Sequence, residues 1–212
     1  MTTHSRQERE ALADSLLDVG PHAPTVCDGW TAADLAAHVV VRERSPVAGL
    51  GIVVPPLAGV TARAMDRLRT SQSYDALVET LRQGPPRWSP FGVSSAVEAA
   101  ANTIEMFIHH EDVRRGQPSW EPRDLDPGLE ALLARRFASS ARLMTRHAPV
   151  GVRFRLPDGT VVQGRSANPT VVVSGPAGEL TLYASGRQRV ARVDVDGDDA
   201  SVAALAGARL GL

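Results

Sequence analysis

Lysine is absent from this chain of 212 residues, because all 23 basic side chains are arginines. A mechanism that forms a Schiff base on a lysine amine is therefore excluded. Cysteine is nearly absent as well: Cys27 has no partner for a disulfide within the chain, which predicts a reducing, cytoplasmic location. Neither sign of charge is in excess, since 24 acidic residues give a formal net charge of −1. Proteins that bind nucleic acid need a basic surface to displace counterions, so we expect no nucleic-acid partner.

Long hydrophobic runs are also missing. The longest apolar stretch, residues 47–60, is interrupted by Gly49, Gly51, Pro55 and Pro56. A helix that crosses a bilayer needs about 20 apolar residues, so we expect no membrane-spanning segment. The polar first ten residues do not resemble a secretory signal. With 43% apolar and 22% charged residues, the composition is that of a globular protein.

Two patterns of hydrophobic residues divide the chain near Pro149. Before this proline, apolar residues recur at helical spacing, and capping signals such as Thr31 with Asp34 mark helix starts. The helices predicted there are 5–19, 31–44, 55–69, 73–81, 95–115 and 126–147. After it, the pattern alternates with period 2. It predicts strands at 152–156, 160–162, 170–173 and 189–195, with short helices at 176–183 and 198–205. The first two strands are predicted to form a hairpin with Asp158-Gly159 in its turn. The fold is therefore predicted to be α+β, with a helix bundle at 1–148 and a small α/β domain at 151–212.

The predicted helix 95–115 carries the most informative pattern. Its polar residues are spaced four and three apart and share one stripe: Glu98, Asn102, Glu105, His109 and Asp112. The carboxylate of Glu105 and the imidazole of His109 can converge on one divalent ion. The alternative is a solvated helix face with one ordinary i,i+4 contact. His110 points about 100° away from His109, so we do not expect it to share an ion with His109.

A second helix supplies one more candidate ligand. His38 follows Asp34 by one turn and lies on or beside the inward face of that helix. It is either a core histidine with satisfied hydrogen bonds or a metal ligand. Together with Glu105 and His109 it would leave an open coordination position, as catalytic zinc sites do. For Asp34 we favour helix capping over a hydrogen bond to His38, and for Cys27 a role as a small buried apolar residue.

Three segments resemble the mycothiol-dependent maleylpyruvate isomerase family, which is part of the wider DinB-like metal-binding four-helix bundles. The first is Cys27-Asp-Gly-Trp-Thr-Ala-Ala-Asp-Leu-Ala-Ala-His38, and the second is Asn102-Thr-Ile-Glu-Met-Phe-Ile-His-His-Glu-Asp-Val-Arg-Arg-Gly116. The third, from Val173 to Asp198, is similar to the small α/β tail of that family and to sterol-carrier-like folds.

This resemblance implies an N-terminal DinB-like four-helix bundle followed by a small sterol-carrier-like α/β domain. It implies zinc, or another divalent metal, held by His38, Glu105 and His109. The thiol cosubstrate would be mycothiol, the low-molecular-weight thiol of actinobacteria. The metal would activate this thiol for isomerisation, or for thiol transfer, on a small electrophilic substrate.

An anionic group of the substrate or of the cofactor would have to meet an arginine, and Arg187 is our candidate for that catalytic and cofactor-binding role. The alternative for Arg187 is a surface arginine near the end of a helix. The alternative function for the whole chain is a non-catalytic metal- or ligand-binding protein of the same fold.

Overall fold

The computed structural model describes residues 3–45, 48–49, 51, 54–89 and 95–211, without the side chains of residues 55 and 95–101. The chain forms two compact units, Met1–Glu121 and Pro122–Leu212. The class is α+β, as predicted: helices make up the first unit, and a four-stranded sheet with helices makes up the second. Among the described helices, none combines the length and the apolar character that crossing a membrane requires.

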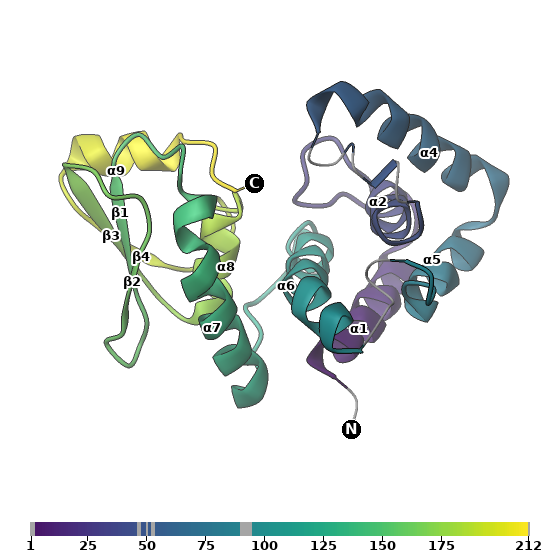
Figure 1. The fold of residues 1–212 in the computed structure, drawn as a ribbon, viewed down its shortest axis with the longest axis horizontal. Coiled ribbons are helices and arrows are strands. Elements are labelled where there is room, and N and C mark those ends of the chain that lie inside the picture. The colour runs from purple at the N-terminus through teal and green to yellow at the C-terminus, as the bar shows by residue number, and fades with distance from the viewer. Residues whose placement is uncertain (1–2, 46–47, 50, 52–53, 90–94, 212) are drawn as a thin grey trace. The chain divides into compact units, whose positions relative to one another are not determined.

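The secondary structure described in the N-terminal unit is helical, apart from an isolated β-bridge between Pro24 and Thr31 (Figure 1). They are α1 (His4–Val19), α2 (Ala32–Arg44), the 3-10 helix η1 (Pro55–Leu57), α4 (Ala58–Ser71), α5 (Tyr74–Gln83) and α6 (Ser95–Arg114). Two of the predicted starts are confirmed, because Thr31 and Asp34 form a capping box at α2 and Ser73 caps α5. The start predicted at Ser5 was wrong: Thr3 accepts the capping hydrogen bond of α1, so the helix begins earlier.

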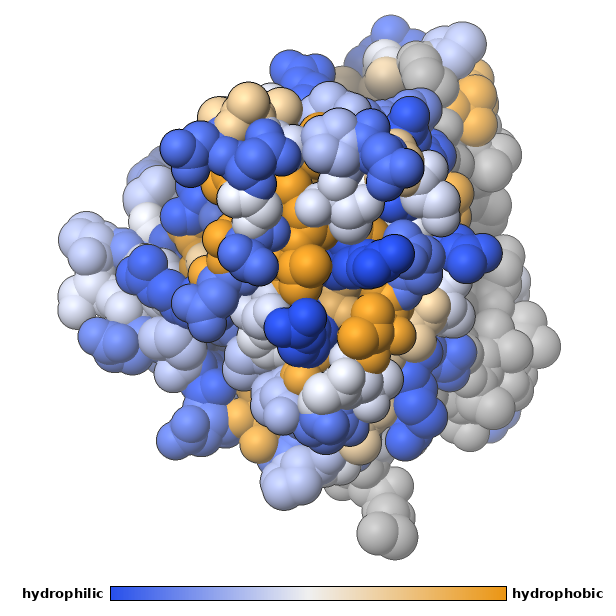
Figure 2. Space-filling view, turned by 90° about the vertical axis from the view of Figure 1, so that its left-hand side faces the viewer, coloured by the Kyte–Doolittle hydropathy of each residue, from blue (hydrophilic) through white to orange (hydrophobic). Residues whose placement is uncertain are grey.

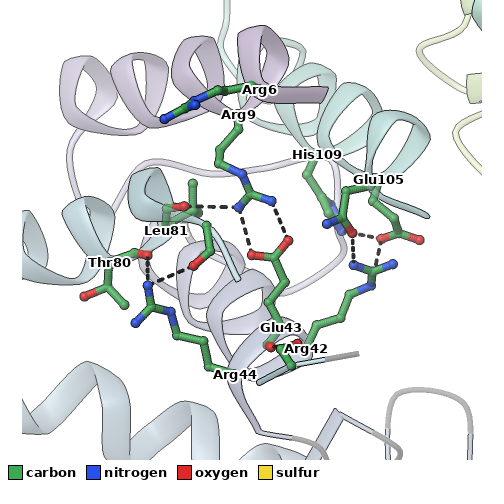
Figure 3. A network of polar contacts seen from close by, with 12 residues as sticks. Arg6, Arg9, Arg42, Glu43, Arg44, Thr80, Leu81, Glu105 and His109 are labelled. Atoms are coloured by element: carbon green, nitrogen blue, oxygen red, sulfur yellow. Dashed lines mark hydrogen bonds and ion pairs between the residues drawn. The ribbon is translucent and has the colours of Figure 1, made fainter. Parts of the chain in front are cut away.

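A buried ion pair ties three helices of this unit together. The guanidinium of Arg9 on α1 donates to both carboxylate oxygens of Glu43 on α2, at 2.5 and 2.8 Å. It also donates to the carbonyl of Leu81 on α5, at 3.1 Å (Figure 3). Around this pair, α1 packs against α5 and α6, and α2 packs against α4 and α5. The arrangement fixes the position of α2 relative to α1 and α5.

The C-terminal unit contains helix α7 (Pro127–Met144), strands β1 (Gly151–Arg155), β2 (Val161–Gln163) and β3 (Thr170–Ser174), helix α8 (Ala177–Ala184), strand β4 (Asp194–Asp196) and helix α9 (Asp199–Ala206). The strand order is β2-β1-β3-β4. β1 runs parallel to β3, and the other two pairs are antiparallel. The predicted hairpin is confirmed, with Gly159 at φ 84° in its turn.

Two parts of the predicted organisation differ from the structure. Helix α7 belongs to the C-terminal unit, where Phe137 packs edge-on against Phe154 of β1 with ring centroids 4.8 Å apart. The division therefore lies after Glu121, upstream of the expected boundary at residue 148. The strand predicted at 189–195 was wrong, because the chain turns where the Val190 amide donates to the Arg187 carbonyl, which leaves only the short β4.

The sheet has one buried and one exposed face. Along β1 the side chains of Val152 and Phe154 are buried, whereas those of Arg153 and Arg155 are exposed. Figure 2 shows one side of the molecule, on which hydrophilic side chains surround a short band of hydrophobic ones. The alternation along β1 thus follows the period of 2 from which the strand was predicted.

Candidate metal centre

Helix α2 places the first candidate ligand. The Thr31 amide donates to the Asp34 carboxylate at 2.9 Å, and the Asp34 amide donates back to the Thr31 hydroxyl at 3.3 Å. This capping box confirms the role favoured for Asp34. His38 follows one turn later with a side chain that is buried, and its ring lies 4.9 Å from the ring of Trp30.

Helix α6 places the other two candidates next to His38. The ring centroids of His38 and His109 are 5.2 Å apart at an interplanar angle of 75°. The Nε2 atom of His109 lies 3.6 Å from a carboxylate oxygen of Glu105, one turn earlier on the same helix. The structure therefore brings His38 close to the pair of Glu105 and His109. His38 precedes Glu105 by 67 residues in the chain, and Glu105 precedes His109 by 4. Two imidazoles and one carboxylate form a donor set that divalent zinc accepts.

Asp112 orients the ring of His109. Its Oδ2 atom lies 3.0 Å from Nδ1 of His109 and also accepts a hydrogen bond from the Cys27 thiol at 3.2 Å. Because a carboxylate only accepts hydrogen bonds, Nδ1 carries a proton, so a ring that loses its second proton holds the lone pair at Nε2. A carboxylate behind a histidine in this way is typical of metal sites. Asp112 is fully buried, so it does not belong to a solvated helix face.

The charged groups of this cluster shift the pKa values of one another. Burial opposes the charged form of His109, but hydrogen bonds with Asp112, Cys27 and Glu105 outweigh it and raise the pKa of His109 well above its usual value. Burial likewise opposes ionisation of Glu105. The hydrogen bond from His109 and the positive charge of Arg42 prevail, and they lower the pKa of Glu105 to about 2. Glu105 is therefore an anion at neutral pH and is available to a cation.

Arg42 is a residue of this site that the sequence analysis missed. Its Nε atom lies 3.6 Å from Glu105, and its Nη1 donates to the Asn102 side-chain oxygen at 2.7 Å (Figure 3). Arg42 follows His38 by four residues, so a shared stripe on α2 was the available signal. The Asn102 amide nitrogen is buried without a hydrogen-bond partner among the described residues. The side chain of Glu98, the first residue of the polar stripe, lies outside the described residues.

A second set of potential ligands overlaps the first. Cys27, His109 and Asp112 each offer one atom, and these atoms lie within 4.8 Å of one another. An ion held there would use Nδ1 of His109 instead of Nε2. The two sets therefore compete for the same imidazole.

His110 takes no part in either set. Its Nδ1 atom lies 3.1 Å from a carboxylate oxygen of Glu8, and its Nε2 atom lies 3.1 Å from the Ser15 hydroxyl. Both partners are on α1. The structure thus confirms that adjacent histidines on α6 point to different surroundings.

A cavity of about 580 Å³ adjoins His38. The residues that line it include Trp30, Asp34, His38, Met65, Asp66 and Arg69. They come from α2, the turn before it and α4, so the cavity lies within the N-terminal unit. It is large enough for a small organic substrate.

Arg187 lies in the C-terminal unit, directly after α8. Its side chain is half-buried and donates to the Ser185 carbonyl at 2.6 Å, and its amide donates to the Leu182 carbonyl at 3.0 Å. These contacts hold the residue at the end of α8. Its predicted role in binding an anionic group remains a prediction.

Comparisons with known proteins identify the fold. Two solved structures, the mycothiol-dependent maleylpyruvate isomerase and a histidine-to-alanine variant of it, are each similar to this chain with a TM-score of 0.60. The similarity covers 92% of this chain and 96% of theirs, at 18% sequence identity. No protein-family profile and no curated protein matches the sequence. The chain thus shares the overall fold of that isomerase.

Proposed function

We propose that this chain is a mycothiol-dependent metalloenzyme that acts on a small electrophilic substrate. His38, Glu105 and His109 would hold a divalent metal, zinc by preference. The observation that carries the proposal is their convergence from two helices, with His38 and His109 ring centroids 5.2 Å apart beside a cavity. A DinB-like bundle for the N-terminal unit and a sterol-carrier-like C-terminal unit belong to the same proposal.

The residue types present suit such an ion, and among the described residues the group whose ligand atoms all lie within 4.8 Å of one another is Cys27, His109 and Asp112. Asp112 would keep the proton of His109 on Nδ1 while the ion displaced the proton of Nε2, and Glu105 is ionised at neutral pH. Three protein ligands leave room for an exogenous one, and His38 lines the adjoining cavity. A divalent metal, when bound, lowers the pKa of a coordinated thiol, so that the nucleophilic thiolate predominates near neutral pH.

The chain's own residues then position the reaction. Asp112 keeps the His109 ring fixed, and Arg42 keeps the Glu105 carboxylate in place. A mycothiol thiolate in the cavity would add to a double bond conjugated with a carbonyl, and the π electrons would move to the carbonyl oxygen as an enolate. Rotation about the former double bond would follow, and the enolate would then re-form the double bond and expel the thiolate, which leaves the other isomer. Opening of an epoxide by the same thiolate would make the chain a thiol transferase. Arg187 is proposed to bind an anionic group of the substrate or of the cofactor.

A non-catalytic metal protein is the second candidate, and one observation favours it. Cys27, His109 and Asp112 would make a buried site in which Asp112 is fully inaccessible to solvent. Thiolate ligands are typical of structural zinc sites. In that case His38 and Glu105 would not be needed for metal binding.

Elemental analysis of protein purified without chelators tests the proposal. We expect about one ion per chain in the wild type and almost none in His38→Ala or His109→Ala. His22→Ala is the matched control, because His22 is exposed, and it should keep the ion. Cys27→Ala should keep the ion as well. Loss of metal in Cys27→Ala but not in His38→Ala would favour the alternative site formed by Cys27, His109 and Asp112.

Turnover is tested next on the metal-loaded wild type. We expect mycothiol-dependent conversion of an activated alkene or an epoxide, and no conversion by His38→Ala. A wild type that contains stoichiometric metal and turns over none of these electrophiles would reject the enzymatic part of the proposal.

A further inference from the structure

Three hydrogen-bonded side chains on α1 and α6 lie outside both candidate metal sets. His110 of α6 stands between Glu8 and Ser15 of α1, with its Nδ1 3.1 Å from a carboxylate oxygen of Glu8 and its Nε2 3.1 Å from the Ser15 hydroxyl. Glu8 and Ser15 are seven residues apart, about two turns of α1, so both can contact the same ring. Carboxylate, imidazole and hydroxyl therefore follow one another in the order found in serine hydrolases, in some of which glutamate replaces aspartate.

The hydrogen bond with Glu8 orients the ring of His110. An ionised carboxylate only accepts hydrogen bonds, so it keeps a proton on Nδ1. In the neutral ring, Nε2 then carries the lone pair and accepts the hydrogen bond of the Ser15 hydroxyl. This is the tautomer in which an imidazole can take the proton of a serine.

The two ends of this hydrogen-bonded chain differ in their access to solvent. Glu8 and His110 are 5% and 4% exposed, so the contact between carboxylate and imidazole lies in a medium of low dielectric constant. Ser15 is only partly buried, and it lines a cavity of about 220 Å³. An electrophile in this cavity can therefore reach the hydroxyl, whereas the carboxylate behind the ring is shielded from water.

The cavity beside Ser15 lies within the N-terminal unit and suits a small acyl group. Val19, Val113 and Trp120 contribute apolar surface, and its volume is below that of pockets for drug-sized ligands. Arg114 and Ser119 also line it. Their N–H and O–H groups are donors for the negative oxygen that forms when a hydroxyl attacks a carbonyl.

We propose that Glu8, His110 and Ser15 form a second catalytic site, which hydrolyses short-chain carboxylic esters. The Ser15 oxygen attacks the ester carbonyl carbon while its proton passes to Nε2 of His110. The tetrahedral intermediate then expels the alcohol, which takes this proton, and an acyl group remains on Ser15. Water attacks the acyl group in the same way, giving its proton to His110, and the acid leaves as the proton returns to the Ser15 oxygen. This activity does not depend on the proposed metal function.

A fluorophosphonate probe with a biotin tag tests the reactivity of Ser15. Such probes modify serines that a neighbouring base activates: the serine oxygen bonds to phosphorus and fluoride leaves. Peptide mapping of the labelled full chain by mass spectrometry then locates the modified residue. We expect the label on Ser15 in the wild type, no label in Ser15→Ala, and labelling at least about 100-fold slower in His110→Gln. Ser139→Ala is the matched control, because Ser139 is an exposed serine of α7 that donates to the Arg136 carbonyl, and it should be labelled like the wild type.

Hydrolysis of p-nitrophenyl acetate tests turnover, and Ser15→Ala should lose the activity of the wild type. Three results would overturn the proposal: no label on Ser15 in the wild type, a wild-type labelling rate in a folded His110→Gln variant, or ester hydrolysis that Ser15→Ala retains. The first result needs the wild type alone, so the proposal can fail even if His110→Gln does not fold. Metal content is measured separately, and Ser15→Ala should keep the metal of the wild type.

Discussion

Replacing Asp112 by asparagine tests how the metal centre is supported. Asp112 is fully buried and lies 3.0 Å from Nδ1 of His109. Asparagine keeps the size of the side chain but removes its charge. If the amide oxygen faces Nδ1, the hydrogen bond loses its charge assistance. If the amide nitrogen faces Nδ1, it donates a hydrogen bond there and forces the proton onto Nε2, where the lone pair is required.

The expected size of the effect follows from these two outcomes. Loss of a carboxylate behind a metal-binding histidine typically lowers metal affinity by about 10–100-fold. That range corresponds to about 1.4–2.7 kcal/mol at 25 °C. Because Cys27 also donates to Asp112, the variant further removes the anionic acceptor of that thiol. We therefore expect the upper part of the range.

Competition of zinc against a chromophoric chelator measures the affinity directly. Asp14→Asn serves as the control, because Asp14 is 67% exposed and pairs only with Arg82 among the ion pairs of the described residues. It should bind zinc as tightly as wild type. Circular dichroism shows whether Asp112→Asn remains folded. A folded Asp112→Asn variant with wild-type zinc affinity would refute the role assigned to Asp112.

Three further predictions concern stability. Glu43→Gln leaves the buried guanidinium of Arg9 without its anion, and urea denaturation should show a loss of about 3–5 kcal/mol; a loss below about 1 kcal/mol would contradict this. The neutral hydroxyl of Tyr74 donates a hydrogen bond to the Leu16 carbonyl, and burial raises the pKa of Tyr74. The stability that this neutral hydroxyl contributes to the folded state is therefore complete below the unfolded pKa of about 10 and is lost as pH rises above it. Tyr74→Phe should therefore be less stable than wild type by about 1 kcal/mol at pH 8, and the difference should shrink by pH 11; a constant difference would argue against it. Phe137→Ala, in the core of the C-terminal unit, should cost about 3–5 kcal/mol in thermal or urea unfolding, and a cost below about 1 kcal/mol would mean that α7 does not pack there.

Local signals in the sequence predicted much of the structure. The capping box at Thr31, the caps at Ser73 and Asp126 and the turn at Gly159 all lie where the sequence placed them. Each depends on residues within one turn of one another, so no knowledge of the fold is needed. The same holds for Glu105 and His109, whose spacing on one helix determines their proximity.

Contacts between segments that are distant in the chain could be predicted less well from the sequence. The apolar stripe of 126–147 indicates that the helix has a buried face, but not which unit covers it, and the structure assigns it to the sheet. The proximity of Arg42 to Glu105 depends on how α2 packs near α6, which the pattern of either helix alone does not specify. The convergence of His38 with His109 was anticipated because a family resemblance supplied the pairing.

Because His109 and His110 point to different surroundings, the spacing of residues along α6 is as important as their identity. His109 contacts Asp112, whereas His110 contacts Glu8 on α1. Insertion of a single residue between Glu105 and His109 would rotate everything downstream by about 100°. Isoleucine would then occupy the ligand position and His109 would face α1. Natural variants of this protein should therefore exchange residues within this helix far more readily than they gain or lose one.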